Sequence, residues 1–250
     1  MSKLKSGAYN PLHEKRLGII IPVYNERENI VKTLQAIRQK VKTANVIYIV
    51  YDFIEDDTLP AARDFIASYG DMNVVFLHNN KEGALEAIKL GFAKATEPFL
   101  LVTMADMSDD YGDVDDMCTL MDEGYDIVCG SRYMKGGRQI GDNSIKKLMS
   151  KVACISLKYL AGIPTYDATN SFKLYRKALI NQINIESNGG FELGLEIVVK
   201  AYFDGYKITE IPTVWYDRTE GHSRFKLIRW SPNYLRWYRY ALRKAFFREF

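Results

Sequence analysis

Short apolar runs alternate with longer amphipathic stretches through the first half of the chain, and this alternation most restricts the fold. The runs, which read as strands, are Leu17 to Val23, Asn45 to Tyr51, Asn73 to Leu77, Phe99 to Thr103 and Asp126 to Cys129. Between the first two, apolar residues recur at three- and four-residue spacing and predict a helix that begins just after Asn25. Strand, helix and strand in succession predict an α/β, Rossmann-like fold with a mostly parallel central sheet flanked by helices.

The pattern changes after Gly130. The expected elements there are a Gly- and Lys-rich loop at 134–142, a helix near 144–160, a strand near 172–175 and a helix near 193–203. Since no low-complexity linker interrupts the chain, we expect one domain over residues 1–224. It would have a first half at about 17–130 and a second half at about 131–224, followed by a separate C-terminal helix over 225–250.

Composition narrows the class of protein. With 250 residues, 47% of them apolar, the chain can bury a full hydrophobic core. Its three cysteines are far apart and set among apolar neighbours, which favours buried thiols over a disulfide framework or a zinc site. No stretch approaches the roughly 20 apolar residues of a spanning helix, and the first residues lack an apolar leader segment, so we expect a cytoplasmic protein.

Positive charge is concentrated at the C-terminus. Residues 225–250 contain seven basic residues and one acidic residue, a net charge of +6, which leaves a net −3 for the first 224 residues. Ser231-Pro232 is a favoured helix start. One face of the expected helix is apolar and aromatic, and it consists of Tyr234, Leu235, Tyr238, Ala241, Leu242, Ala245 and Phe246. Such a helix docks on its own domain, packs in a homo-oligomer, or lies peripherally on an anionic membrane surface. We expect no nucleic-acid binding.

Acidic side chains follow three of the predicted strands. Glu26 comes after the first strand, Asp52 after the second and Asp106 after the fourth. Because ligands of open α/β sheets bind at the carboxyl ends of the strands, we expect these carboxylates to meet in one crevice. Taken singly, each has the alternative role of a turn or helix-capping residue.

An ordered set of motifs resembles glycosyltransferase family 2, and within it most closely the dolichol- or polyprenol-phosphate sugar synthases. The motifs are Ile20-Ile21-Pro22-Val23-Tyr24-Asn25-Glu26, Asp52 with Asp56 and Thr58, Met104-Ala105-Asp106-Met107-Ser108-Asp109-Asp110, Gly130-Ser131-Arg132-Tyr133, Asp167-Ala168-Thr169-Asn170-Ser171-Phe172-Lys173, Glu210-Ile211-Pro212, and Arg218 with Gly221-His222-Ser223-Arg224. They extend over about residues 17–226. The resemblance implies a GT-A fold and an inverting glycosyltransferase.

The resemblance also implies roles for single residues. Those that would bind a GDP- or UDP-linked sugar are Pro22, Tyr24, Glu26, Asp52, Asp106 and Arg132. Those that would bind the acceptor or its phosphate are Lys146, Ser150, Arg218 and Arg224. Asp106 would also hold the metal, Mg²⁺ or Mn²⁺, because hard oxygen ligands suit these ions. The sequence departs from the family's Asp-x-Asp pattern, since Met104 stands at the first aspartate position.

The sequence leaves more than one class of acceptor open. A polyprenyl phosphate or other lipid phosphate is already ionised and needs cations more than a base. A glycan hydroxyl, as in surface polysaccharide synthesis, must lose a proton, and Asp167 is the candidate base for that case. A non-catalytic nucleotide-binding relative is the third alternative. A dinucleotide-dependent oxidoreductase is excluded, because Pro22-Val23-Tyr24-Asn25-Glu26 replaces the required Gly-x-Gly-x-x-Gly.

Overall fold

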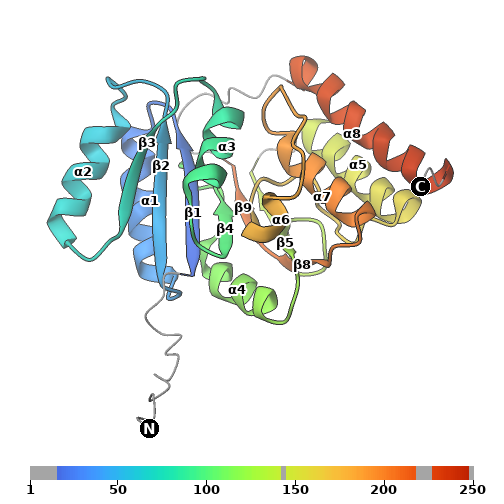
Figure 1. Ribbon diagram of the computed structural model, residues 1–250, viewed down its shortest axis with the longest axis horizontal. Coiled ribbons are helices and arrows are strands. Elements are labelled where there is room, and N and C mark those ends of the chain that lie inside the picture. The colour runs from blue at the N-terminus through green and yellow to red at the C-terminus, as the bar shows by residue number, and fades with distance from the viewer. Residues whose placement is uncertain (1–15, 142–144, 218–226, 248–250) are drawn as a thin grey trace, which may run out of the picture.

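A seven-stranded sheet forms the centre of the molecule (Figure 1). The computed structural model describes residues 16–141, 145–217 and 227–247, without the side chains of 145, 146 and 227–231. In the order β3-β2-β1-β4-β7-β5-β8, the strands are Val74–His78, Asn45–Tyr51, Leu17–Val23, Phe99–Val102, Lys173–Arg176, Ile127–Ser131 and Ile208–Pro212. The expected α/β fold with a mostly parallel sheet is confirmed, and the predicted strand bounds differ by one or two residues at some ends.

Strand β1 shows no alternation of polar and apolar residues because it is buried on both faces of the sheet. It pairs in parallel with β2 and β4, and all of its residues are buried. Ile19 and Ile21 pack in the cluster on one face of the sheet, whereas Ile20 packs in the cluster on the other face. A strand covered by helices on both faces needs apolar side chains at successive positions.

The second half of the chain completes the same sheet. Strand β7 runs antiparallel to both β4 and β5, and β5 pairs in parallel with β8. The two expected halves therefore share one sheet. A small parallel sheet joins β6 (Arg138–Ile140) to β9 (Val214–Tyr216). The expectation of loop throughout 134–142 was wrong at β6, because three residues are too few to show a strand period and their partner lies far along the chain.

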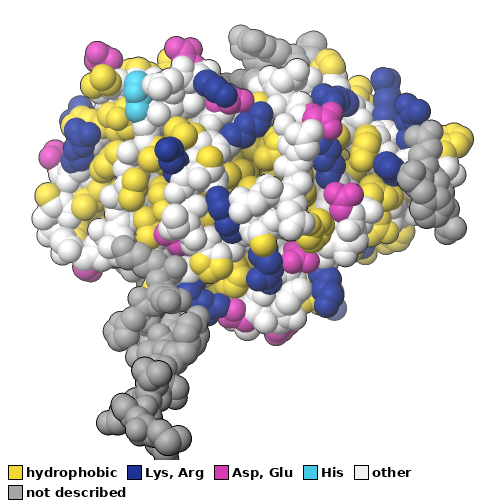
Figure 2. All heavy atoms as spheres, in the orientation of Figure 1, with side chains coloured by type: hydrophobic (Ala, Val, Ile, Leu, Met, Phe, Trp, Pro, Cys, Tyr) yellow, Lys and Arg dark blue, Asp and Glu magenta, His cyan; other side chains and the backbone are white. Residues whose placement is uncertain are grey.

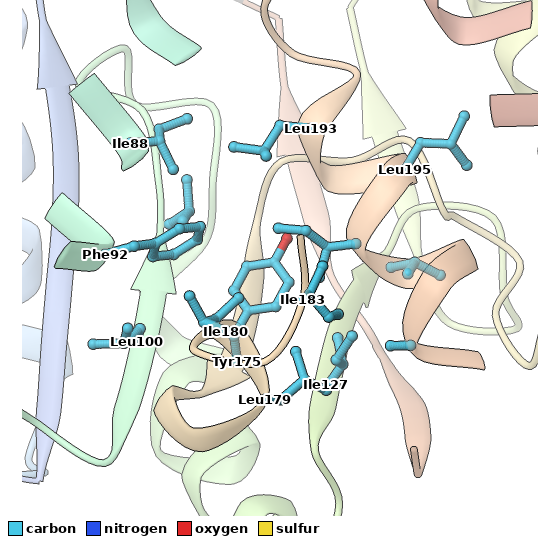
Figure 3. Packing of buried hydrophobic residues seen from close by; sticks show 14 of the residues in the cluster. Ile88, Phe92, Leu100, Ile127, Tyr175, Leu179, Ile180, Ile183, Leu193 and Leu195 are labelled. Carbon is cyan, nitrogen blue, oxygen red and sulfur yellow. The ribbon is translucent and has the colours of Figure 1, made fainter. Parts of the chain in front are cut away.

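Helices cover both faces of the sheet. Their bounds are α1 Arg27–Lys40, α2 Thr58–Tyr69, α3 Ala84–Lys94, α4 Val114–Asp122, α5 Ile145–Ala161, α6 Lys177–Ile180, α7 Leu193–Phe203 and α8 Leu227–Phe247, with a 3₁₀ turn at Tyr111–Asp113. Helices α1, α2 and α4 contribute to one core cluster, and α3 and α5 to α8 contribute to the other. In the second cluster the rings of Phe92 of α3 and Tyr175 of β7 pack edge to face, with centroids 5.7 Å apart (Figure 3).

The C-terminal helix differs from its predicted form. Helix α8 begins at Leu227, so Pro232 lies inside it. Proline lacks an N–H, and the helix therefore forgoes one backbone hydrogen bond at that turn. Trp237 and Ala241 are its fully buried residues. Five residues of the predicted apolar face pack on the domain, namely Tyr234, Tyr238, Ala241, Leu242 and Ala245, whereas Leu235 and Phe246 at its margin are exposed. The side that packs on the domain is thus shifted toward Trp237.

Among the described residues, no helix combines the length and the apolar character that crossing a bilayer requires.

Candidate active site

A cleft of about 1050 Å³ opens at the carboxyl ends of β1 to β4. Its walls are the segments that follow these strands, together with the segment Ser187–Phe191 that precedes α7. Pro22, Tyr24, Glu26 and Asp52 all line it, beside Met104 and Ala105. The expectation that the first two acidic strand ends share one crevice thus agrees with the geometry, and Asp106 follows directly after a residue of the cleft wall.

The turn between β1 and α1 is fixed by hydrogen bonds to residues that follow β2. Asn25 adopts a left-handed backbone conformation with φ of 52°, which asparagine tolerates better than most residues. Its N–H donates to Asp56 Oδ1 at 3.1 Å, and the N–H of Glu26 donates to Thr58 Oγ1 at 2.9 Å. Asp56 is buried. It therefore shapes the cleft wall from behind.

Tyr24 presents an aromatic face at the cleft. Its side chain is 43% exposed, and its ring meets that of Phe53 edge-on, with centroids 5.1 Å apart. The two rings come from the ends of β1 and β2. A flat exposed ring steadied by a second ring is suited to stacking on a planar ligand group.

Asp52 connects two loops of the cleft. Its Oδ1 accepts from Asn79 Nδ2 at 2.8 Å, and its Oδ2 accepts from the N–H of Gly83 at 2.8 Å. Gly83 caps α3 with φ of +90°, a conformation that a residue with a Cβ adopts only with strain. The β3–α3 loop, including Lys81, thereby enters the site. Sequence reasoning missed this loop, although the carboxyl end of β3 lies at the same sheet edge.

Asp106 lies behind the cleft wall and is only 8% exposed. Its Oδ1 accepts hydrogen bonds from both the N–H and the hydroxyl of Ser108. Asp109, which accepts from Thr103 Oγ1 at 2.8 Å, is a buried neighbour. Burial, and then the negative charge of Asp106, raise the pKa of Asp109 to about 7. Two carboxylates are thus close enough to repel each other.

This pair fits one type of metal site. Within the described residues, no group of three or more metal-ligating side chains gathers. The described residues therefore do not form a metal site in which protein side chains supply all the ligands. Magnesium commonly takes one or two carboxylates, with substrate phosphates and water completing its shell. A cation at Asp106 would also relieve the repulsion from Asp109.

The predicted cation Arg132 is paired with the predicted base Asp167. Arg132 Nε donates to Asp167 Oδ2 at 2.7 Å, and Nη2 donates to Oδ1 at 2.9 Å. Asp167 is fully buried, and 12% of the Arg132 side chain is exposed. Burial opposes the charge, but the carboxylate outweighs it and raises the pKa of Arg132. Arg132 lies 5.9 Å from the centre of the Trp215 ring, and Trp215 pairs with Asp109 in an isolated antiparallel bridge, so the cationic group lies on the same side as the acidic pair.

Ser150 belongs to the same cluster. Its hydroxyl lies 2.9 Å from Thr169 Oγ1, and Thr169 donates to Asp167 Oδ1 at 3.4 Å. Three predicted site residues, Arg132, Ser150 and Asp167, are therefore brought together. Arg218, Arg224 and the side chain of Lys146 lie outside the described residues.

The segment Ser187–Phe191 is the other part of the site that sequence reasoning missed. Two buried glutamates of the α7 region hold it through its backbone. Glu192 accepts from the N–H groups of Gly189 and Gly190, each at 2.7 Å. Glu196 accepts from the N–H of Ser187 at 2.8 Å, and Trp237 Nε1 of α8 donates to the Ser187 hydroxyl at 3.1 Å. Its Asn-Gly-Gly sequence signals a turn, but nothing local places that turn beside β1.

Comparisons with known proteins point to one family. Residues 18–183 match the family model described as Glycosyl transferase family 2. The chain is 29% identical over 217 residues to a dolichol-phosphate mannosyltransferase of Pyrococcus furiosus, and the match covers 84% of this chain but only 59% of that protein. It is 25% identical over 215 residues to a polyprenol monophosphomannose synthase of Mycolicibacterium smegmatis, and this match covers 84% of this chain and 81% of that protein.

Solved structures show the same fold. Glucosyl-3-phosphoglycerate synthase from Mycobacterium tuberculosis in complex with UDP superposes with a TM-score of 0.65 at 13% identity, over 91% of this chain and 80% of that one. The same enzyme in complex with Mn²⁺, UDP and phosphoglyceric acid gives a TM-score of 0.63 at 12% identity, over 92% of this chain and 78% of that one.

Proposed function

The chain belongs to glycosyltransferase family 2, and we propose that it transfers a sugar from a nucleotide-sugar to a polyprenyl phosphate with inversion at the anomeric carbon. One observation carries the proposal most directly. Glu26 and Asp52 line a single cleft whose wall continues along the chain into Asp106. Arg132 approaches Asp109, the buried neighbour of Asp106, through Trp215. The names of the two curated relatives support the same acceptor chemistry.

The donor would occupy the cleft along the ends of β1 and β2. Tyr24 offers a ring face to the base, and the carboxylates of Glu26 and Asp52 can accept hydrogen bonds from base or ribose donors. UDP and GDP are both candidates for the nucleotide. Helix α1 begins beside Glu26 and α3 beside Gly83, so two helix N-termini face the region where the diphosphate would lie.

Asp106 is the residue that would hold a divalent cation, Mg²⁺ or Mn²⁺. When bound, such an ion neutralises negative charge on a departing nucleoside diphosphate. The hydrogen bonds from Ser108 keep the carboxylate of Asp106 oriented for that role. Met104 lines the cleft wall, and its thioether is not an oxygen ligand for such an ion.

The acceptor phosphate would meet the cationic side of the site. A phosphate monoester carries its nucleophilic oxygen ionised near neutral pH, so Arg132 can orient it without a general base. Attack on the anomeric carbon from the face opposite the nucleoside diphosphate breaks the sugar–phosphate bond and inverts the centre. Asp167 is fully buried, which favours a role in fixing Arg132 over a role in accepting a proton.

Transfer of radiolabelled sugar to a short-chain prenyl phosphate tests the function. We expect product from UDP- or GDP-linked sugars in Mg²⁺ or Mn²⁺, loss of turnover in Asp106→Ala, and full activity in Asp64→Ala, which changes an exposed acid of α2. Unchanged turnover in Asp106→Ala would remove that residue from the site. Transfer only to a hydroxyl acceptor, or nucleotide binding without any transfer, would refute the proposed acceptor or the catalytic role.

A further inference from the structure

Exposed apolar side chains gather on two neighbouring helices. Of the fourteen large hydrophobic side chains that are exposed in the described part of the chain, five lie on α5 and three on α8. Helix α8 packs along α5, and Tyr238 Oη lies 2.9 Å from Ser156 Oγ. Figure 2 shows hydrophobic side chains beside Lys and Arg at the end of the molecule where Figure 1 places these helices. Soluble domains rarely leave so much apolar surface together without a partner.

The exposed residues of α5 form one face. They are Leu148, Met149, Val152, Tyr159 and Leu160, which are 62, 52, 57, 70 and 50% exposed. At 3.6 residues per turn, these positions fall on one side of the helix. Cys154 and Leu157 are buried on the opposite side, where Cys154 Sγ lies 3.3 Å from Thr169 Oγ1 of the Arg132 cluster. One face of α5 therefore contacts the proposed acceptor site, and the apolar face lies about 10 Å away across the helix.

The charges on the two helices are of one sign. Helix α5 contains four lysines, α8 contains five basic residues, and neither contains an Asp or Glu. On α8 the basic side chains Arg236, Arg239, Arg243 and Lys244 border a hollow of about 470 Å³. Arg239 and Arg243 are exposed. Arg236 is paired with Glu186 from the segment before α7, at 2.5 Å. An apolar face bordered by the cations Arg239 and Arg243 is complementary to the surface of an anionic bilayer.

We propose that α5 and α8 together form a docking surface for anionic lipid bilayers, with the apolar face of α5 entering the headgroup region and Arg239 and Arg243 of α8 binding lipid phosphates. This assignment rests on the proposed function in one respect: it would bring the acceptor cluster close to a phosphate carried by a membrane lipid. It differs from the membrane alternative considered from the sequence, in which the aromatic face of the C-terminal helix would be the anchor. Most of that face, including Tyr238, Ala241 and Leu242, packs on the domain.

Vesicle flotation of the full chain tests the apolar component. We expect binding to vesicles of phosphatidylcholine with 30% phosphatidylglycerol, and binding weaker by about tenfold or more after Leu148→Asp with Val152→Asp, because charges would enter the apolar contact. The matched control is Ile54→Asp with Ile140→Asp, two exposed residues elsewhere that are 73 and 48% exposed. Equal binding by the two double variants would overturn the proposal.

The same assay tests the charge component. Arg239→Glu with Arg243→Glu should weaken binding by about tenfold or more, and Lys94→Glu with Lys207→Glu, which makes the same change in net charge on other exposed lysines, should not. Binding that is as tight to pure phosphatidylcholine would overturn the role of the arginines. Sedimentation velocity without lipid tests the alternative that a second copy of the chain binds this face. If the wild-type protein is a dimer, if Leu148→Asp with Val152→Asp dissociates it, and if the wild type does not float with vesicles, the proposal is overturned in favour of that second copy.

Transferase activity separates this inference from the proposed function. The Leu148→Asp, Val152→Asp variant should keep wild-type turnover on a water-soluble short-chain prenyl phosphate while it loses flotation. A wild-type protein that floats but transfers no sugar would refute the function and leave the docking surface standing.

Discussion

Both carboxylate oxygens of Asp167 accept hydrogen bonds from the guanidinium of Arg132, and Oδ2 also accepts from the Arg132 backbone N–H at 3.0 Å. The pair joins the end of β5 to the segment before β7. Oδ1 receives a further bond from the N–H of Asn170 at 3.2 Å. A carboxylate so fully occupied is placed to fix a cation, and little of it remains for proton transfer.

Asp167→Asn should therefore impair both stability and turnover. Breaking a buried ion pair leaves Arg132 without its partner, and we expect the free energy of unfolding to fall by about 3 kcal/mol. Turnover should fall because the guanidinium loses its orientation, while the pH profile of the remaining kcat keeps its shape. Denaturant melts and kcat measured from pH 5.5 to 9 check both points.

Asp126→Asn is the matched control for that variant. It breaks another Asp–Arg pair, with Arg176 Nε at 3.0 Å, away from the cleft. It should lower stability without lowering kcat in the folded protein. Loss of one limb of the pH profile in Asp167→Asn alone would instead identify Asp167 as a base.

Asp52→Ala should weaken nucleotide binding. The change removes the acceptors of Asn79 Nδ2 and of the Gly83 N–H, and the β3–α3 loop then loses its tie to β2. Loss of an ionic hydrogen-bond acceptor costs about 1.5–3 kcal/mol, so we expect the Kd for UDP or GDP to rise by about tenfold or more. Calorimetric titration measures this, with Asp64→Ala as the control. An unchanged Kd for both nucleotides would place the base and ribose elsewhere.

The thiols should be unreactive in the folded protein. Burial raises the pKa of Cys154 to about 11 and those of Cys118 and Cys129 to about 12. A raised pKa keeps each thiol protonated at pH 8, and all three are buried. Titration with a thiol-specific disulfide reagent at pH 8 should detect no group in the native state and three after unfolding. Rapid reaction of one thiol in the native protein would contradict this.

The strands and the acidic strand ends could be predicted from the sequence because both are local features. Buried parallel strands such as β1 are apolar at every position, and residues after such strands lie at one sheet edge whatever the order of the strands. The position of Glu26 and Asp52 at that edge was predicted in this way. The antiparallel insertion of β7 between β4 and β5 is not local, since it depends on pairing between segments more than seventy residues apart along the chain in the case of β4.

The orientation of α8 and the position of the segment Ser187–Phe191, the Ser187 loop, could not be predicted for a related reason. A helical wheel fixes which side chains lie together but not which apolar side faces the domain. Leu235 and Trp237 are both apolar, and only packing against α5 and α7 decides that Trp237 is buried. The Ser187 loop reaches the cleft through bonds to Glu192 and Glu196, whose partners are set by tertiary structure.

Trp237→Phe tests whether α8 supports the donor site through that loop. The change keeps an aromatic ring in the core but removes the Nε1 hydrogen bond to Ser187 Oγ, worth about 1 kcal/mol. Since Ser187 lines the cleft, we expect the KM for the nucleotide-sugar to rise by about fivefold with kcat nearly unchanged. Tyr240→Phe is the control, because Tyr240 packs on Trp237 with ring centroids 5.7 Å apart but has no part in the loop. A fall in kcat and stability with an unchanged KM would mean that Trp237 only packs the core, and the loop would then owe its position to Glu192 and Glu196 alone.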